Sequence, residues 1–118
     1  MPVTSSRSSI KRWPAAEDVL AAARAWARSL LDGDPHVHAV GVIGSYARAE
    51  AGVGSDLDLV VVRRDAAPRP HLLGADVDVL PVPVDALHYT DSELARVLAL
   101  GGRMAAVLQD EVVWLARR

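Results

Sequence analysis

Apolar residues recur at spacings of three and four positions after Pro14, and this pattern predicts an amphipathic helix over residues 14–33. Proline suits the first turn of a helix, and the acidic Glu17 and Asp18 suit its N-terminal end. The pattern stops at Gly33, which is typical of a helix end. The apolar stripe consists of Val19, Leu20, Ala23, Trp26, Ala27, Leu30 and Leu31.

Two later stretches are rich in Val, Ile and Leu and predict short buried strands over residues 36–43 and 57–63. Between them, residues 46–50 predict a helical turn. A third apolar run predicts a strand over residues 75–82. The connection before it, residues 64–74, holds two prolines and is shorter than the crossover that parallel neighbours need. We therefore expect this third strand to be antiparallel to its predecessor.

The last part of the chain predicts one more helix and two β-prone segments. Thr90 or Asp91 suits the N-cap of a helix that runs to about Gly101. The β-prone segments cover residues 104–108 and 112–115. Together, these elements predict an α/β (α+β-like) fold with a small mixed sheet and helices mainly on one face.

The composition is that of one globular domain with an aliphatic core. The chain has 118 residues, 51% of them hydrophobic, with no Phe and no Cys. The absence of Cys excludes disulfides, thiolate zinc sites and cysteine nucleophiles. Residues 1–12 carry Ser, Thr and basic side chains with little to bury, so we expect a flexible N-terminal arm before one domain over residues 13–118. Because the core is small, burial of an apolar face in a homo- or hetero-oligomer would be no surprise.

Charge and hydropathy narrow the classes of partner. The formal net charge is −2, which gives no general attraction to nucleic acid or anionic lipid, so we expect no direct nucleic-acid binding. No apolar run approaches the length of a membrane span, and the polar first residues lack the apolar stretch of a signal peptide. We therefore expect no membrane partner and a cytoplasmic location.

The residues that follow the first strand have the chemistry of a phosphate-binding turn. Gly44 stands where the strand passes into a helical turn, so backbone N–H groups there can approach an anion closely. Ser45 adds a hydroxyl group. Arg48, one turn later, can reach the same anion with a planar and permanently charged guanidinium. These residues predict a small polyphosphate site.

Two carboxylates stand at the start of the second strand. Asp56 and Asp58 are two residues apart, so the alternation of a strand places both on one face while Leu57 and Leu59 face the core. Hard oxygen ligands favour Mg²⁺ or Mn²⁺. With a third carboxylate from a neighbouring strand, such a cluster activates an attacking hydroxyl group and neutralises a leaving phosphate. The implied reaction is phosphoryl or nucleotidyl transfer.

The third carboxylate is Asp76 or Asp78, which are also two residues apart, and strand alternation alone does not choose between them. We prefer Asp78, which is flanked by Val77 and Val79. A carboxylate deep in an apolar strand is the harder one to explain without a cation.

Each of these features has an ordinary structural explanation when it stands alone. A Gly-Ser turn is commonly a simple helix start, and an Asp-x-Asp pair at a strand edge is commonly solvated. Their combination in this order and spacing favours a shared site. His36 and His38 also form a His-x-His pair that resembles a pair of metal ligands. With no third ligand in view, the better interpretation is that they lie on one face of a strand.

The same residues resemble a known family. The matching features are Gly44 and Ser45, Arg48 after an alanine, ten residues between Ser45 and the first aspartate, and Ser-Asp-Leu-Asp-Leu at residues 55–59. They resemble the polymerase-beta-type nucleotidyltransferase superfamily, and the chain is similar in size to its minimal nucleotidyltransferase (MNT) branch. The resemblance implies a nucleotidyltransferase fold and transfer of a nucleoside monophosphate, commonly AMP from ATP, with Mg²⁺.

Position by position, the resemblance implies a role for each of these residues. Asp56 and Asp58 would be catalytic metal ligands, and Asp78 would be the third ligand and base. The nucleotide would be bound by Gly44, Ser45, Arg48 and Ser55. Two departures are visible: Ala49 replaces the glycine that usually follows the arginine, and the connection over residues 64–74 is shorter than the family's helix-containing link.

The resemblance also implies an acceptor. Small members of this family are often antitoxins that add AMP to a HEPN-family ribonuclease toxin, so a HEPN toxin is the expected partner. Two alternatives stay open. One is modification of a small molecule such as an aminoglycoside, for which related enzymes use an additional helical domain. The other is a non-catalytic module that binds a partner through the same fold.

Overall fold

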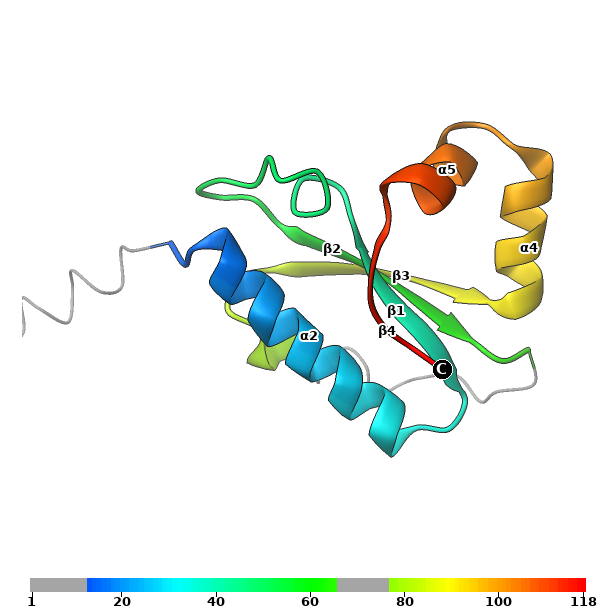
Figure 1. Cartoon of the computed structure of the whole chain (residues 1–118), viewed down its shortest axis with the longest axis horizontal. Helices are drawn as coiled ribbons and strands as arrows, with labels where there is room; N and C mark the ends of the chain where they lie inside the picture. Colours follow the sequence, from blue (N-terminus) through cyan, green and yellow to red (C-terminus); the bar gives the residue numbers. More distant parts are fainter. Residues whose placement is uncertain (1–12, 66–76) are drawn as a thin grey trace, which may run out of the picture.

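A computed structural model describes residues 13–65 and 77–118, which form a four-stranded mixed sheet with helices packed on it (Figure 1). The strands lie in the order β3-β2-β1-β4. Strand β1 is antiparallel to β2 and to β4, whereas β2 and β3 are parallel. The bounds are Val37–Ile43 for β1, Leu57–Arg63 for β2, Val84–Thr90 for β3 and Val113–Arg117 for β4. The mixed sheet and the first two predicted strands are confirmed.

Helix α2, Ala16–Gly33, covers one face of the sheet. It begins two residues after Pro14 and ends at the glycine where the apolar pattern stops, so the predicted helix is confirmed. Its buried side chains, Val19, Ala23, Trp26, Ala27 and Leu31, pack with those of Val40, Val42, Leu57, Leu59 and Val61 from β1 and β2. Burying an aliphatic side chain of this size contributes roughly 1.5–3 kcal/mol. This helix therefore supplies a large part of the core.

The other face of the sheet carries three short helical segments. These are α4 (Asp91–Leu100), α5 (Arg103–Ala106) and the π-helix η2 (Val107–Glu111). They pack over a second apolar cluster that includes Ala39, Ile43, Val60, Val62 and Leu108. In Figure 1 the strands lie between α2 and the pair α4 and α5, so the helices are divided between both faces rather than placed mainly on one. No helix within the described ranges is long and apolar enough to cross a membrane.

The capping residue of α4 is Thr90. Its side chain accepts a hydrogen bond from the backbone N–H of Glu93 at 3.2 Å, and the Glu93 carboxylate accepts one from the N–H of Thr90 at 2.9 Å. This reciprocal capping box satisfies two N–H groups that the helix leaves without partners. The predicted helix is therefore confirmed, and of the two candidate caps the structure selects Thr90.

The prediction of a β-prone segment over residues 104–108 is wrong. Gly101 and Gly102 have φ angles of 73° and 92°, and after them the chain turns into α5 and then η2. Met104 and the two alanines that follow are good helix formers, which explains the result. The later segment is confirmed, because β4 begins at Val113.

The prediction of an antiparallel strand over residues 75–82 is also wrong. Within its described part, Val77–Val79 form a 3₁₀ helix, η1, and the third strand begins only at Val84. Pro81 and Pro83 explain the shift, because proline has no N–H for a sheet ladder. The connection between β2 and β3 is then residues 64–83, which is long enough for the parallel crossover that the structure contains.

Candidate active site

Gly44 begins a turn directly after β1, against the start of β2. Its φ is 75°, a left-handed conformation that glycine adopts without strain. A Cβ atom at this position would overlap the carboxylate oxygen Oδ2 of Asp58. The turn is closed by backbone hydrogen bonds from Arg48 N–H to Gly44 O at 3.1 Å and from Glu50 N–H to Ser45 O at 2.8 Å. The predicted turn is present, and it brings its first residue into contact with an acidic side chain.

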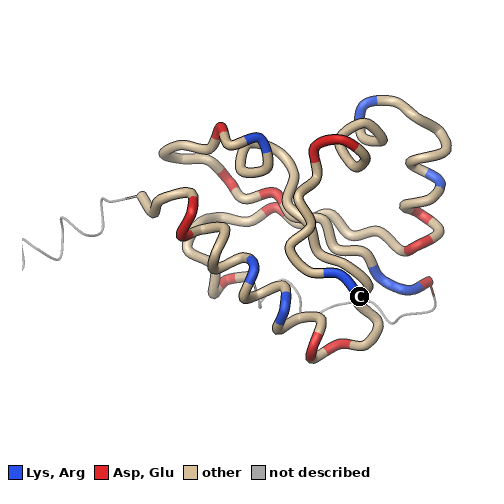
Figure 2. The backbone as a smooth tube through the Cα atoms, in the orientation of Figure 1, with Lys and Arg blue, Asp and Glu red and all other residues tan. Residues whose placement is uncertain are grey.

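Asp58 and Asp85 lie directly opposite each other on the parallel strands β2 and β3. In the antiparallel pairing of β1 and β2, Asp58 is opposite Ile43, whose side chain belongs to the cluster under α4 and η2. Residues that are opposite in a sheet share a face, so Asp58 and Asp85 point to that same side. Figure 2 shows the acidic positions of β2 and β3 next to each other in the sheet.

The electrostatics of Asp58 reflect these neighbours. Burial raises the pKa of its carboxyl group, and the negative charges of Asp85 and Asp56 raise that pKa further. The positive charge of Arg48 lowers it in part. Asp56 is exposed just before β2 begins. Asp85 and Asp56 therefore each repel the charge of Asp58, and the guanidinium of Arg48 partly offsets this repulsion.

Asp78 does not lie on a strand, and it is not among the charged groups that shift the pKa of Asp58. Asp78 is exposed on the 3₁₀ helix η1, not on a strand, because the strand starts after the two prolines. The expectation that it lies on a strand beside Asp56 and Asp58 is therefore wrong. The alternative candidate, Asp76, lies outside the described residues.

Asp85 is an acidic residue of this group that the sequence pattern did not predict. A signal for it was present in the sequence: an apolar stretch resumes immediately after Pro83, as Val-Asp-Ala-Leu at residues 84–87. The carbonyl oxygen of Pro83 accepts a hydrogen bond from the N–H of Leu57 at 2.9 Å, so pairing with β2 starts there. Proline as a marker of the strand start would have directed attention to this aspartate.

The predicted nucleotide-binding residues lie around the same turn. Ser55 lies at the end of the loop that follows this turn, where its hydroxyl oxygen accepts a hydrogen bond from the N–H of Gly52 at 2.9 Å. Ser55 thus holds the loop that leads into Asp56. Ser45 follows Gly44 and is partly exposed, and Arg48 is exposed. Ala49, which stands where the resemblance implies a glycine, has a φ of 60° and is therefore left-handed.

The donor set matches a hard divalent cation in its chemistry. Asp56, Asp58 and Asp85 offer only oxygen ligands, and a cation would relieve the repulsion that Asp58 experiences from the other two. Within the described ranges, no three His, Cys, Asp or Glu side chains are already grouped as a metal site. The carboxylates would therefore have to turn toward one another around an ion.

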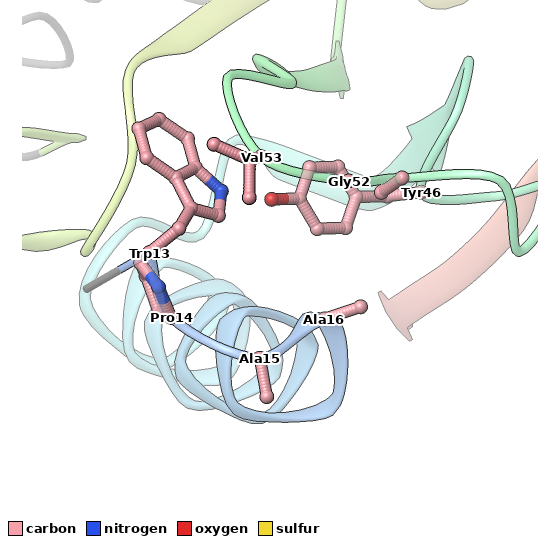
Figure 3. Close-up of a pocket in the computed structure, with 8 residues that line it drawn as sticks. Trp13, Pro14, Ala15, Ala16, Tyr46, Gly52 and Val53 are labelled. Carbon is pink, nitrogen blue, oxygen red and sulfur yellow. The ribbon is translucent and has the colours of Figure 1, made fainter.

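A pocket of about 230 Å³ lies on another side of the same loop. Figure 3 shows it between the N-terminal end of α2, with Trp13, and the loop residues Gly52 and Val53. Tyr46, which is only 4% exposed, forms part of its wall. None of the acidic candidates lines this pocket, so it is distinct from the carboxylate group.

A turn with free backbone N–H groups beside a pair of carboxylates suits the binding of phosphates together with a hard cation. A family model described as "Nucleotidyltransferase domain" matches residues 26–98, which is more than half of the chain. The chain belongs to this nucleotidyltransferase family. A comparison with curated proteins found no match.

Several solved structures share the fold. A protein from Sulfolobus solfataricus that is described as a nucleotidyltransferase has a TM-score of 0.60 at 18% identity, over 87% of this chain and 84% of that one. A toxin-antitoxin structure with AMP-PNP has a TM-score of 0.53 at 20% identity, over 75% and 68% of the two chains. A variant of the toxin-antitoxin MntA-HpeT has a TM-score of 0.50 at 18% identity, over 75% and 67%. At these identities the similarity concerns the fold.

Proposed function

We propose that this protein transfers AMP from ATP to a hydroxyl group of an acceptor, with Mg²⁺ bound by Asp56, Asp58 and Asp85. The observation that carries the proposal is the position of Asp58, which faces Asp85 across two parallel strands and touches Gly44 at the start of the turn. Membership of the nucleotidyltransferase family supports the reaction type.

Each part of the site has a role in this reaction. The N–H groups of the turn that starts at Gly44, together with the Ser45 hydroxyl, bind the β- and γ-phosphates. Arg48 adds positive charge at the triphosphate. Asp56, Asp58 and Asp85 would hold Mg²⁺, which would supply charge neutralisation at the phosphates and would favour an ionised attacking oxygen.

In the transfer step the acceptor oxygen attacks the α-phosphorus atom in line with the leaving group. A new O–P bond forms as the bond to pyrophosphate breaks, and pyrophosphate leaves with that electron pair. Asp85, at the exposed edge strand β3, accepts the proton of the attacking hydroxyl group. Asp85 thus takes the role that the sequence had suggested for Asp78.

For the acceptor, we propose a toxin protein of the HEPN family, with this chain as its antitoxin. Two of the proteins that share the fold are toxin-antitoxin structures, one of them solved with the ATP analogue AMP-PNP. The MntA-HpeT structure carries two Asp-to-Glu exchanges two positions apart. The same spacing separates Asp56 and Asp58 in this chain.

The test is transfer of label from α-labelled ATP with Mg²⁺ and a candidate toxin. The proposal predicts a labelled toxin band that is lost with Asp58→Asn and kept with Asp32→Asn, a matched charge change at an exposed residue of α2. Label that moves only to a small molecule would replace the protein acceptor by a small one. An absence of any transfer or of ATP binding would favour a non-catalytic module.

A further inference from the structure

Arg48 forms hydrogen bonds with two glutamates, Glu50 in the same loop and Glu111 near the C-terminal end of the chain. Its Nε–H donates to Glu50 Oε1 at 3.0 Å, and its Nη1–H donates to Glu111 Oε1 at 3.3 Å. These hydrogen bonds raise the pKa of the guanidinium, with the larger effect from Glu50. The contact with Glu50 is local, whereas the contact with Glu111 joins residues 63 positions apart.

Glu111 reaches Arg48 because of the unusual helix that carries it. It is the last residue of the π-helix η2, whose wider turn is closed by a hydrogen bond from Val112 N–H to Val107 O at 3.0 Å. Short π-helical turns are frequent at functional sites. A π turn contains one more residue than an α turn, and this shifts the position of the last side chain of the helix.

The end of η2 is anchored on the sheet next to the site. Val112 packs over Gly41 of β1 so closely that a Cβ at position 41 would lie 2.8 Å from its Cγ2 atom. The ring of Trp114 would lie 2.9 Å from that same Cβ. Only glycine leaves room for this packing. Gly41 thus allows the residue that follows Glu111 to pack closely on β1, on the same segment that carries the contact with Arg48.

Arg48 lies near enough to Asp58 for its charge to act on that carboxylate. The backbone N–H of Arg48 bonds to the carbonyl oxygen of Gly44. A guanidinium has five N–H donors, so two hydrogen bonds to glutamates leave others for a phosphate oxygen. A long and flexible side chain that is held in one orientation loses less entropy when it binds an anion.

We propose that Glu111 is a positioning residue that orients the guanidinium of Arg48 toward the triphosphate of the nucleotide. This inference rests on the proposed function, because it assigns a partner to a residue of that site. Glu111 acts through its hydrogen-bond acceptor and supports nucleotide binding rather than the chemical step.

The experiment measures ATP affinity in the presence of Mg²⁺, together with KM and kcat for label transfer, in Glu111→Ala and Glu111→Gln. The alanine variant should weaken ATP binding and raise KM by about two- to fivefold, the range expected for one exposed ion pair, with kcat unchanged. The glutamine variant keeps an acceptor oxygen and should lie near the wild type. Asp110→Ala, an exposed acidic neighbour on η2, is the matched charge control and should leave KM unchanged.

A second set of variants separates positioning from a general effect of charge or folding. In an Arg48→Ala background, Glu111→Ala should cause no further loss of ATP affinity. The inference is overturned if Glu111→Ala leaves KM unchanged or lowers it, or if its effect persists without Arg48. Wild-type protein that binds no ATP would instead overturn the proposed function, and this inference with it.

Discussion

Gly44 lies against the carboxylate of Asp58, so that a Cβ atom at position 44 would overlap the oxygen Oδ2. Position 44 requires glycine for two reasons. Its φ of 75° is strained for other residues, and there is no space for a side chain. The contact joins the turn that we assign to the phosphates with the carboxylate that we assign to the metal. The spacing between the two parts of the site is therefore built into the fold.

Gly44→Ala should lower the free energy of unfolding by about 1–3 kcal/mol, because it adds left-handed strain and a steric overlap. It should also abolish nucleotide transfer, since the overlap displaces Asp58. Gly52→Ala is the matched control in the same loop, where a Cβ would have nothing within 4 Å. Urea denaturation of both variants measures the difference. Equal stability of the two would contradict this account of the turn.

Ala49→Gly should stabilise the protein by about 0.5–1 kcal/mol. Ala49 has a φ of 60°, and this left-handed conformation is strained for any residue with a Cβ atom. Glycine removes that strain but gives the unfolded chain more backbone entropy. We expect the relief of strain to be the larger of the two effects. Ala47→Gly, two residues earlier and packed against the core, should have the opposite sign. Thermal denaturation of both variants provides the comparison. A destabilised Ala49→Gly protein would show that the turn is not strained.

Asp58→Asn should make the metal-free protein more stable at neutral pH, by about 0.5 kcal/mol, the scale of one unfavourable cross-strand charge pair. Burial and the charges of Asp85 and Asp56 raise the pKa of Asp58 in the folded state. Its protonated form therefore favours folding. That contribution is complete below the ordinary pKa of an aspartate and is lost as the pH rises through the raised pKa.

The stability gain from Asp58→Asn should consequently be larger at pH 7 than at pH 4. Urea denaturation in the presence of a chelator measures it at both pH values. Addition of Mg²⁺ should stabilise the wild type and have less effect on the variant. A variant that is less stable than the wild type at pH 7 would mean that the carboxylate has a structural role.

Local patterns predicted much of the fold. The apolar spacing after Pro14 is sufficient for α2, because the face that it buries is defined within the helix itself. Similarly, Thr90 and Glu93 predict the start of α4, because the capping box forms between these two residues alone. The turn at Gly44 and the pair Asp56 and Asp58 were recognisable from their spacing, since they lie within one short stretch.

The remaining features depend on contacts between distant residues. Whether Asp78 or Asp85 stands beside Asp58 is decided by which segment pairs with β2, and the apolar run before the two prolines resembled a strand. Likewise, the contact between Arg48 and Glu111 arises from a π-helix packed over Gly41. Neither local spacing nor strand alternation contains this information.

The most direct test of the central claim is transfer of label from α-labelled ATP, with Mg²⁺, by Asp85→Asn and Asp78→Asn. Both variants remove one exposed carboxylate, so their effect on net charge is the same. If Asp85 completes the acidic group, Asp85→Asn should slow transfer at least about 100-fold, the usual contribution of a catalytic base, while Asp78→Asn stays within about twofold of the wild type. An active Asp85→Asn protein together with an inactive Asp78→Asn protein would contradict the account.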